Sequence, residues 1–156
     1  MSTRGREPVF LCQFALYGTV PVPQGSKKAF VIRGTNRAVL TDDNATKLKP
    51  WREAVAQEAA TAMALQGLAA IQKGAIRVSV RFEFPFLKSH FKSDGVTLRD
   101  DYPLYKDSKP DTDKLCRALG DAMSGVCYRD DAQIAEWRAL RIYSSMPGVT
   151  VRVYAL

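Results

Sequence analysis

The sequence contains a single histidine and only three cysteines, and these shortages narrow its possible chemistry. His90 alone cannot form a histidine-rich metal site, and a Ser-His or Cys-His nucleophile would have to use this one residue. The cysteines are odd in number and have no C-x-x-C spacing, which excludes a disulfide framework and a zinc motif: Cys12, Cys116 and Cys127. We therefore expect buried thiols in a reducing compartment, and any catalysis has to rely on carboxylates.

Long apolar runs are also missing. No stretch approaches the ~20 residues of a membrane span, and residues 1–8 lack the apolar core of a signal peptide. The chain has 156 residues, of which 46% are hydrophobic and 25% charged, as in ordinary globular domains. We expect one domain over residues 1–156 in the cytoplasm, with no membrane partner and no small-molecule cofactor.

The charge is strongly positive and unevenly distributed. The formal net charge is +7, which favours an anionic partner such as nucleic acid. Residues 1–52 hold 9 Lys and Arg against 3 acids, whereas residues 107–131 hold 6 acids against 4 bases. A divalent cation would allow a polyanion-binding protein to keep acids on its binding face. Alternatively, these acids cap helix and turn positions on a solvated face.

Hydrophobic periodicity predicts an α+β fold. Alternation with a period of two, bounded by turn residues, predicts strands over 9–17, 74–84, 133–142 and 149–154, and a hairpin from 29–32 and 38–40. Helical spacing of apolar residues predicts helices over 44–66 and 112–123. We expect one mixed, mainly antiparallel sheet with two principal helices. Residues 85–110 lack periodicity, and loops of this length are usually functional or disordered.

Three carboxylates of the acidic stretch are candidate metal ligands. Asp111 and Asp113 precede the second helix in a segment that Pro110 should make extended, and residues two apart on an extended chain project to one side. The helix and the following strand can return Asp131 to the same neighbourhood. Converging carboxylates suit Mg²⁺ or Mn²⁺, which can activate water and stabilise charge on a scissile phosphate.

Structural roles for the same residues remain open. Asp111 or Thr112 can be the helix N-cap, and Arg117 can form i,i+4 pairs with Asp113 and Asp121. Asp130 and Asp131 can be ordinary turn residues, since aspartate is common in turns.

Basic residues that are candidate DNA contacts fall in three places. Two belong to a glycine-containing turn before the predicted hairpin, two flank the turn of the hairpin, and three belong to the long loop: Lys27, Lys28, Arg33, Arg37, Lys88, Lys92 and Lys109. The loop also carries Phe86, which we expect to pack beneath it, and Phe91, for which a core position and a wedge at a branched DNA are both open. Basic residues interleaved with aromatics suit unstacked or branched DNA.

Residues 109–134 resemble the RusA family of Holliday-junction resolvases. The family pattern is a D-x-D pair opening a helix, a basic residue four positions later, D-A-[LM], G-V and D-D-x-Q-[IV]. This chain carries Asp111-Thr112-Asp113, Arg117, Asp121-Ala122-Met123, Gly125-Val126 and Asp130-Asp131-Ala132-Gln133-Ile134. The resemblance implies a homodimeric, magnesium-dependent endonuclease that nicks four-way DNA junctions. It implies Asp111, Asp113 and Asp131 as metal-binding catalytic acids, Arg117 as a catalytic residue that stabilises charge in the transition state, and supporting roles for Asp121 and Asp130.

Two positions depart from the family pattern. The family often has lysine where this chain has Arg117, and asparagine where it has Lys114. Arginine preserves charge stabilisation but not a role that requires deprotonation. Two other functions remain as alternatives: a non-catalytic branched-DNA-binding protein with structural carboxylates, and an RNA-binding protein, which is disfavoured because no RNA-module motif is present.

Overall fold

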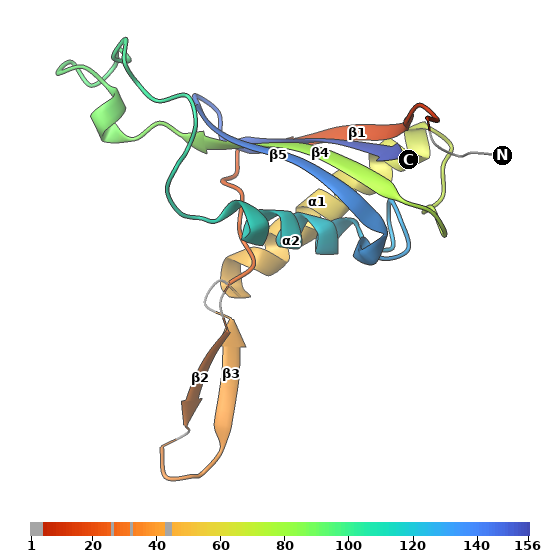
Figure 1. Ribbon diagram of the computed structural model, residues 1–156. Coiled ribbons are helices and arrows are strands. Elements are labelled where there is room, and N and C mark those ends of the chain that lie inside the picture. Colours follow the sequence, from red (N-terminus) through yellow and green to blue (C-terminus); the bar gives the residue numbers. More distant parts are fainter. Residues whose placement is uncertain (1–4, 26, 32, 43–44) are drawn as a thin grey trace.

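The computed structural model describes residues 5–25, 27–31, 33–42 and 45–156, and its α+β architecture confirms the predicted class (Figure 1). The strands are β1 (Val9–Tyr17), β2 (Lys27–Val31), β3 (Ala38–Asp42), β4 (Ile76–Pro85), β5 (Ile134–Ser144) and β6 (Gly148–Ala155). The helices are α1 (Ala45–Leu65) and α2 (Thr112–Met123), with 3₁₀ turns η1 (Lys88–His90) and η2 (Asp131–Gln133). No helix in these ranges is long and apolar enough to cross a membrane.

The main sheet is mixed and has four strands in the order β1-β6-β4-β5. Only β4 and β5 are parallel, and the neighbouring pairs are antiparallel. A parallel pair needs a long crossover connection, and this crossover contains the long loop, α2 and η2. Both helices lie on the same face of the sheet (Figure 1). The crossover therefore places α2 alongside β5, the strand at the sheet edge.

The core lies between this sheet face and the helices. Alternate residues of β4 are buried, as its period-two pattern predicts: Ile76, Val78, Val80, Phe82 and Phe84. The apolar stripe of α2 is buried against them: Leu115, Ala118, Leu119 and Ala122. All three cysteines are buried and free, as expected.

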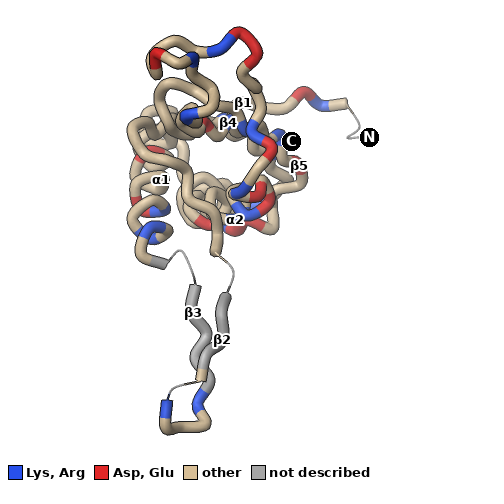
Figure 2. Tube along the Cα trace, turned by 90° about the vertical axis from the view of Figure 1, so that its left-hand side faces the viewer, with Lys and Arg blue, Asp and Glu red and all other residues tan. Residues whose placement is uncertain are grey.

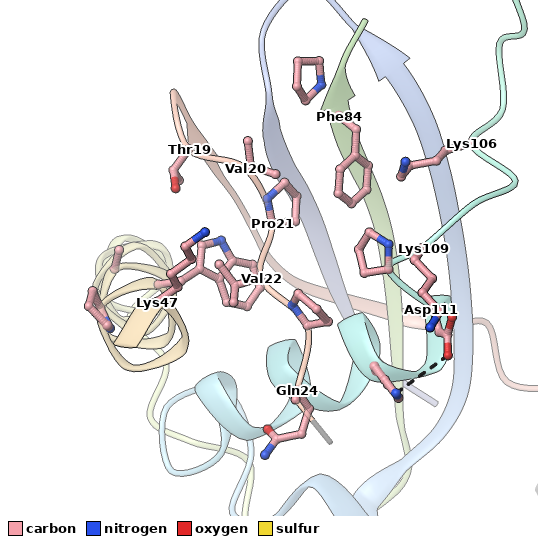
Figure 3. Close-up of a pocket in the computed structure, with 18 of the residues that line it drawn as sticks. Thr19, Val20, Pro21, Val22, Gln24, Lys47, Phe84, Lys106, Lys109 and Asp111 are labelled. Atoms are coloured by element: carbon pink, nitrogen blue, oxygen red, sulfur yellow. Dashed lines mark ion pairs between the residues drawn. The ribbon is translucent and has the colours of Figure 1, made fainter. Parts of the chain in front are cut away.

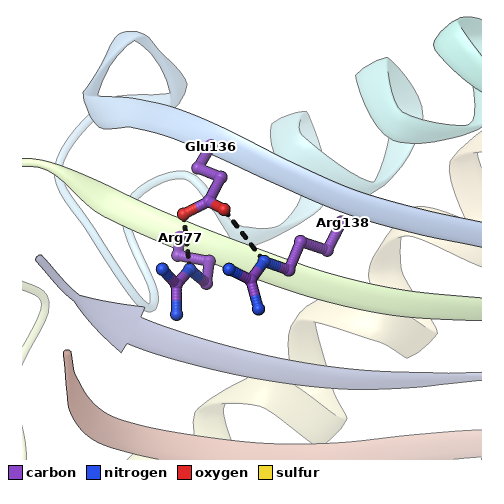
Figure 4. Close-up of polar contacts among 3 residues, drawn as sticks. All are labelled: Arg77, Glu136 and Arg138. Carbon is purple, nitrogen blue, oxygen red and sulfur yellow. Dashed lines mark hydrogen bonds and ion pairs between the residues drawn. The ribbon is translucent and has the colours of Figure 1, made fainter. Parts of the chain in front are cut away.

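The opposite face of the sheet carries charged side chains (Figure 4). Glu136 of β5 accepts hydrogen bonds from Arg77, on the adjacent strand β4, and from Arg138. These two bonds, with that from Arg77 the stronger, lower the pKa of Glu136. The contact joins β4 to β5 on the side of the sheet away from the helices.

Strands β2 and β3 form a separate two-stranded antiparallel sheet that extends from the body of the protein (Figure 1). The hairpin expected at 29–32 and 38–40 is present with longer strands, although residue 32 lies outside the described residues. The expected first residue of α1, Asn44, also lies outside them.

The long loop after β4 is held by aromatic packing and by β5. The ring of Phe86 lies 5.4 Å from Tyr102 and 6.1 Å from Phe91, both edge-to-face, which confirms its expected position beneath the loop. Phe91 is half-buried in this cluster. His90 is buried, and its Nδ1 accepts a hydrogen bond from the Leu87 amide, which is a structural role. Sequence periodicity could not predict the structure of this loop, because the contacts that hold it join side chains that are far apart along the loop.

We expect Leu119→Ala to lower the free energy of unfolding by about 2–5 kcal/mol, the range for deleting a buried leucine side chain. Leu119 is fully buried between α2 and the sheet. Leu65→Ala is the matched control, because Leu65 is 82% exposed, and it should change stability by less than about 0.5 kcal/mol. Urea denaturation of both variants measures the difference, and equal effects would contradict the described core.

Candidate active site

Helix α2 begins at the predicted carboxylate pair. Asp111 is the N-cap residue with extended backbone, and Asp113 lies in the first helical turn. The Asp111 side chain makes no capping hydrogen bond; its Oδ2 lies 3.9 Å from Nζ of Lys114. The helical geometry starts between the two aspartates, so the same-side geometry expected for an extended segment does not apply to Asp113.

A cavity of about 550 Å³ between α2 and β5 brings together Asp113, Arg117 and Asp131. Gly120, Trp137 and Ala139 are among the other residues that line it. Asp111 lines a different and larger cavity. Two of the three predicted acids and the predicted basic residue therefore line one cavity, and Asp111 lines the neighbouring one. Within the described ranges, no group of three histidine, cysteine, aspartate or glutamate side chains is arranged to hold a metal ion.

The alternative structural roles are met only in part. Among the residues that the structure describes, Arg117 forms an ion pair with neither Asp113 nor Asp121. Asp130 does act as a turn residue, because its Oδ1 accepts the Ala132 amide at 2.8 Å and caps η2. Asp113 is thus left exposed at the cavity without a structural ion pair in the described part of the chain.

Asp131 lies in a small cluster of acids. Partial burial raises its pKa, and hydrogen bonds and repulsion involving Asp130 and Asp121 raise it further. The pKa of Asp130 is lowered, first by the Ala132 amide and then by the hydrogen bond with Asp131. The ionised form of Asp131 is therefore less favourable than that of a free aspartate.

Gly120 allows Trp137 of β5 to lie close to helix α2. A Cβ at position 120 would lie 3.3 Å from the Trp137 ring and 3.7 Å from the Asp131 Cβ. The Gly120 carbonyl also accepts a 2.7 Å hydrogen bond from the buried hydroxyl of Tyr128. Burial raises the Tyr128 pKa, which keeps this hydroxyl protonated as a donor. The sequence analysis did not single out these residues, although a glycine inside a helical pattern often marks close packing.

The nearby cysteine is an unsuitable nucleophile. Burial, and secondarily the charge of Asp113, raise the pKa of Cys116 to about 11. A thiol is a weak nucleophile until it loses its proton. The reactive groups of the cavity are therefore its carboxylates and Arg117.

The predicted DNA contacts lie around this body in three places. Arg33 and Arg37 are exposed in the turn at the far end of the hairpin (Figure 2). Lys27 and Lys28 lie in β2, and their side chains are outside the described part of the structure. Lys88 and Lys92 are exposed in the long loop, and Lys109 lines the larger cavity beside Asp111.

We expect Asp131→Asn to raise the melting temperature at pH 7 in the presence of EDTA. The folded-state pKa of Asp131 is raised, so its contribution to stability is fully present below the ordinary aspartate pKa of about 3.9 and is lost as pH rises through the folded value. Replacing Asp131 by asparagine removes this loss of stability, so the difference in melting temperature from the wild type should disappear near pH 3. Thermal melts across pH measure it, with the exposed Asp100→Asn as control; a gain persisting at pH 3 would contradict the electrostatic cause.

Comparison with known proteins adds one finding. No curated protein matches the chain. A family model described as endodeoxyribonuclease RusA matches residues 19–154, which is all but the first 18 and last two residues. The matched region includes both helices, the main sheet from β4 onwards and the whole cavity. The chain therefore belongs to the RusA endodeoxyribonuclease family.

Proposed function

We propose that this protein is a metal-dependent endonuclease that resolves four-way DNA junctions by paired symmetric nicks. The observation that carries the proposal is the cavity in which Asp113, Arg117 and Asp131 lie together, in a chain that belongs to an endodeoxyribonuclease family. The surrounding charge supports it, because a +7 protein is attracted to DNA phosphates.

The residues of the cavity fit Mg²⁺, with Mn²⁺ as an alternative. Magnesium retains several waters and needs only one or two protein carboxylates together with substrate phosphates. Asp113 and Asp131 supply such oxygens, and burial, together with the neighbouring acids, raises the pKa of Asp131. Asp111, the third proposed ligand, lies at the start of the same helix and is engaged by Lys114. When bound, the ion supplies an activated water and neutralises charge on the scissile phosphate.

Arg117 supplies the fixed positive charge of the site. Its guanidinium stays protonated and presents a planar fork that matches phosphate oxygens. Because Arg117 forms no ion pair among the described residues, it is available to the phosphate on which charge develops during hydrolysis. Asp113 and Asp131 would hold the ion that supplies the attacking water, and Arg117 would stabilise the negative charge on the phosphate.

The proposed DNA surface combines the hairpin and the long loop. Arg33 and Arg37, together with Lys27 and Lys28, would track the phosphates of one junction arm, and Lys88, Lys92 and Lys109 those near the cavity. A four-way junction is roughly two-fold symmetric, so two symmetric nicks need two sites. We infer a C2 homodimer, which provides two identical sites through one interface.

The alternative is a non-catalytic protein that binds branched DNA and uses its carboxylates structurally. Structural carboxylates are normally paired or hydrogen-bonded. Asp130 fits that description, whereas Asp113 has no ion pair among the described residues and the charge of Asp131 is disfavoured. The arrangement therefore favours catalysis.

Cleavage of a synthetic four-way junction tests the proposal directly. We expect paired nicks in the junction with Mg²⁺, none in a linear duplex, and none in EDTA. Asp113→Asn should reduce the rate about 100-fold or more, the scale of losing one charge-stabilising group, while junction binding is retained. Asp100→Asn serves as the matched control. Tight junction binding without nicks in either Mg²⁺ or Mn²⁺ would favour the binding-protein alternative.

Lys114, which stands where the family often has asparagine, gives a second test of the proposed metal site. Lys114 neutralises Asp111 across 3.9 Å, and both side chains are partly exposed. An ion pair of this kind is worth up to about 1 kcal/mol. We expect Lys114→Asn to release Asp111 and strengthen the apparent affinity for Mg²⁺ by up to about fivefold, measured as the Mg²⁺ dependence of cleavage. An unchanged or weaker Mg²⁺ dependence would argue against Asp111 as a ligand.

A further inference from the structure

A cavity with a volume of about 940 Å³ lies beside the proposed catalytic site (Figure 3). Its walls come from the segment after β1, the start of α1, the end of β4 and the segment leading into α2. Asp111 lies on its rim, so this cleft and the cavity of Asp113 flank the first turn of α2. We propose that the cleft receives an unpaired DNA nucleotide, whose base packs on the apolar wall and whose phosphate lies at the lysines. This inference rests on the proposed function, because the nucleotide belongs to the DNA that the enzyme cuts.

The accessible wall of the cleft is mainly aliphatic, because its two aromatic residues, Trp51 and Phe84, are each only 4% exposed. It is formed by side chains that include Val20, Pro21, Val22, Trp51, Phe84 and Leu87. Val20 and Leu87 are 44% and 46% exposed, so apolar surface remains available to a ligand. A base has two apolar faces that stack on such surfaces. The volume also falls within the range of about 300–1,000 Å³ that is usual for ligand pockets.

The rim of the cleft is positively charged. Four lysines and a single carboxylate line it: Lys47, Lys106, Lys109, Lys114 and Asp111. Lys106 lies over two aromatic rings, with its Nζ 5.2 Å from the Phe84 ring centre and 5.3 Å from that of Tyr143. Lys47 and Lys109 form no ion pair with any residue that the structure describes. An apolar wall with lysines at its rim is complementary to a base and its phosphate.

The same chemistry distinguishes an unpaired nucleotide from a duplex. In a duplex the base faces are stacked on one another, so they cannot pack against a protein wall unless the base leaves the stack. The strand exchange point of a four-way junction is where this costs least, because unstacking energy is lowest for unpaired or distorted positions. The basic hairpin begins and ends at this rim, near Gly25 and Lys47 (Figure 1). A strand held by the hairpin is thereby led across the cleft towards α2.

Binding measurements in EDTA separate this inference from catalysis. The probes are a 5′-phosphorylated 12-nucleotide thymidine strand and a duplex of equal length, both fluorescently labelled and followed by anisotropy. Val20→Gln places a longer polar side chain without a ring on the apolar wall, and we expect it to weaken single-strand binding several-fold because it removes apolar surface from the base. Duplex binding should change less than about twofold. Leu65→Gln, at an 82% exposed leucine at the end of α1 and outside the proposed DNA surface, is the matched control and should change neither.

The charge of the rim is tested in the same assay. Lys47→Gln should weaken single-strand binding several-fold, and Lys73→Gln, an exposed lysine outside the cleft, should not. If circular dichroism shows that Val20→Gln does not fold, Leu87→Gln makes the same change at the other exposed apolar residue of the wall. Single-strand binding unaffected by these variants, or an equal loss for duplex, would overturn the inference. Neither probe is branched and no metal is present, so this binding test does not depend on junction cleavage. Failure of the protein to cut a junction would therefore contradict the proposed function and leave the cleft inference standing. Junction cleavage that is unchanged by the cleft variants would contradict the cleft inference alone.

Discussion

Helix α2 packs against strand β5 at Gly120, and the candidate active site depends on this contact. A Cβ at position 120 would lie 3.3 Å from the Trp137 ring, which is closer than usual packing distances. The Tyr128 hydroxyl holds the backbone from the other direction through the Gly120 carbonyl. The helix and the strand can therefore lie close enough for Asp113, near the start of one, and Asp131, before the start of the other, to share a cavity.

The electrostatics of the chain follow from the same arrangement. A protein with a net charge of +7 concentrates acids beside α2 and η2, and burial, together with the neighbouring Asp130 and Asp121, raises the pKa of Asp131. The remaining charges are either paired, as for Arg77 and Glu136 on the far sheet face, or exposed, as for Arg33 and Arg37 on the hairpin. Functional sites often retain such electrostatic cost, because the charge is needed for binding or catalysis.

The two cavities on either side of the first α2 turn have different chemistry. The one between α2 and β5 carries acids and an arginine, which suits a metal ion and a phosphate. The larger one carries lysines around an apolar wall, which suits a base with its phosphate. Asp111 and Lys114, paired across 3.9 Å, lie at the boundary between them. The first turn of α2 thus lies between the proposed site of phosphate hydrolysis and the cleft that we propose for an unpaired nucleotide.

The sequence by itself determined the helices, the strands and the class of fold, because periodicity is local and the apolar residues of β4 and α2 repeat at the spacing of their element. It also determined the family, because the motif from Asp111 to Ile134 is a contiguous block. Only the tertiary structure decided which carboxylates share a cavity, and it placed Asp111 and Asp113 at neighbouring cavities because the helix begins between them. The cleft and the close approach at Gly120 were likewise decided by packing between segments distant in the chain, which no local pattern records.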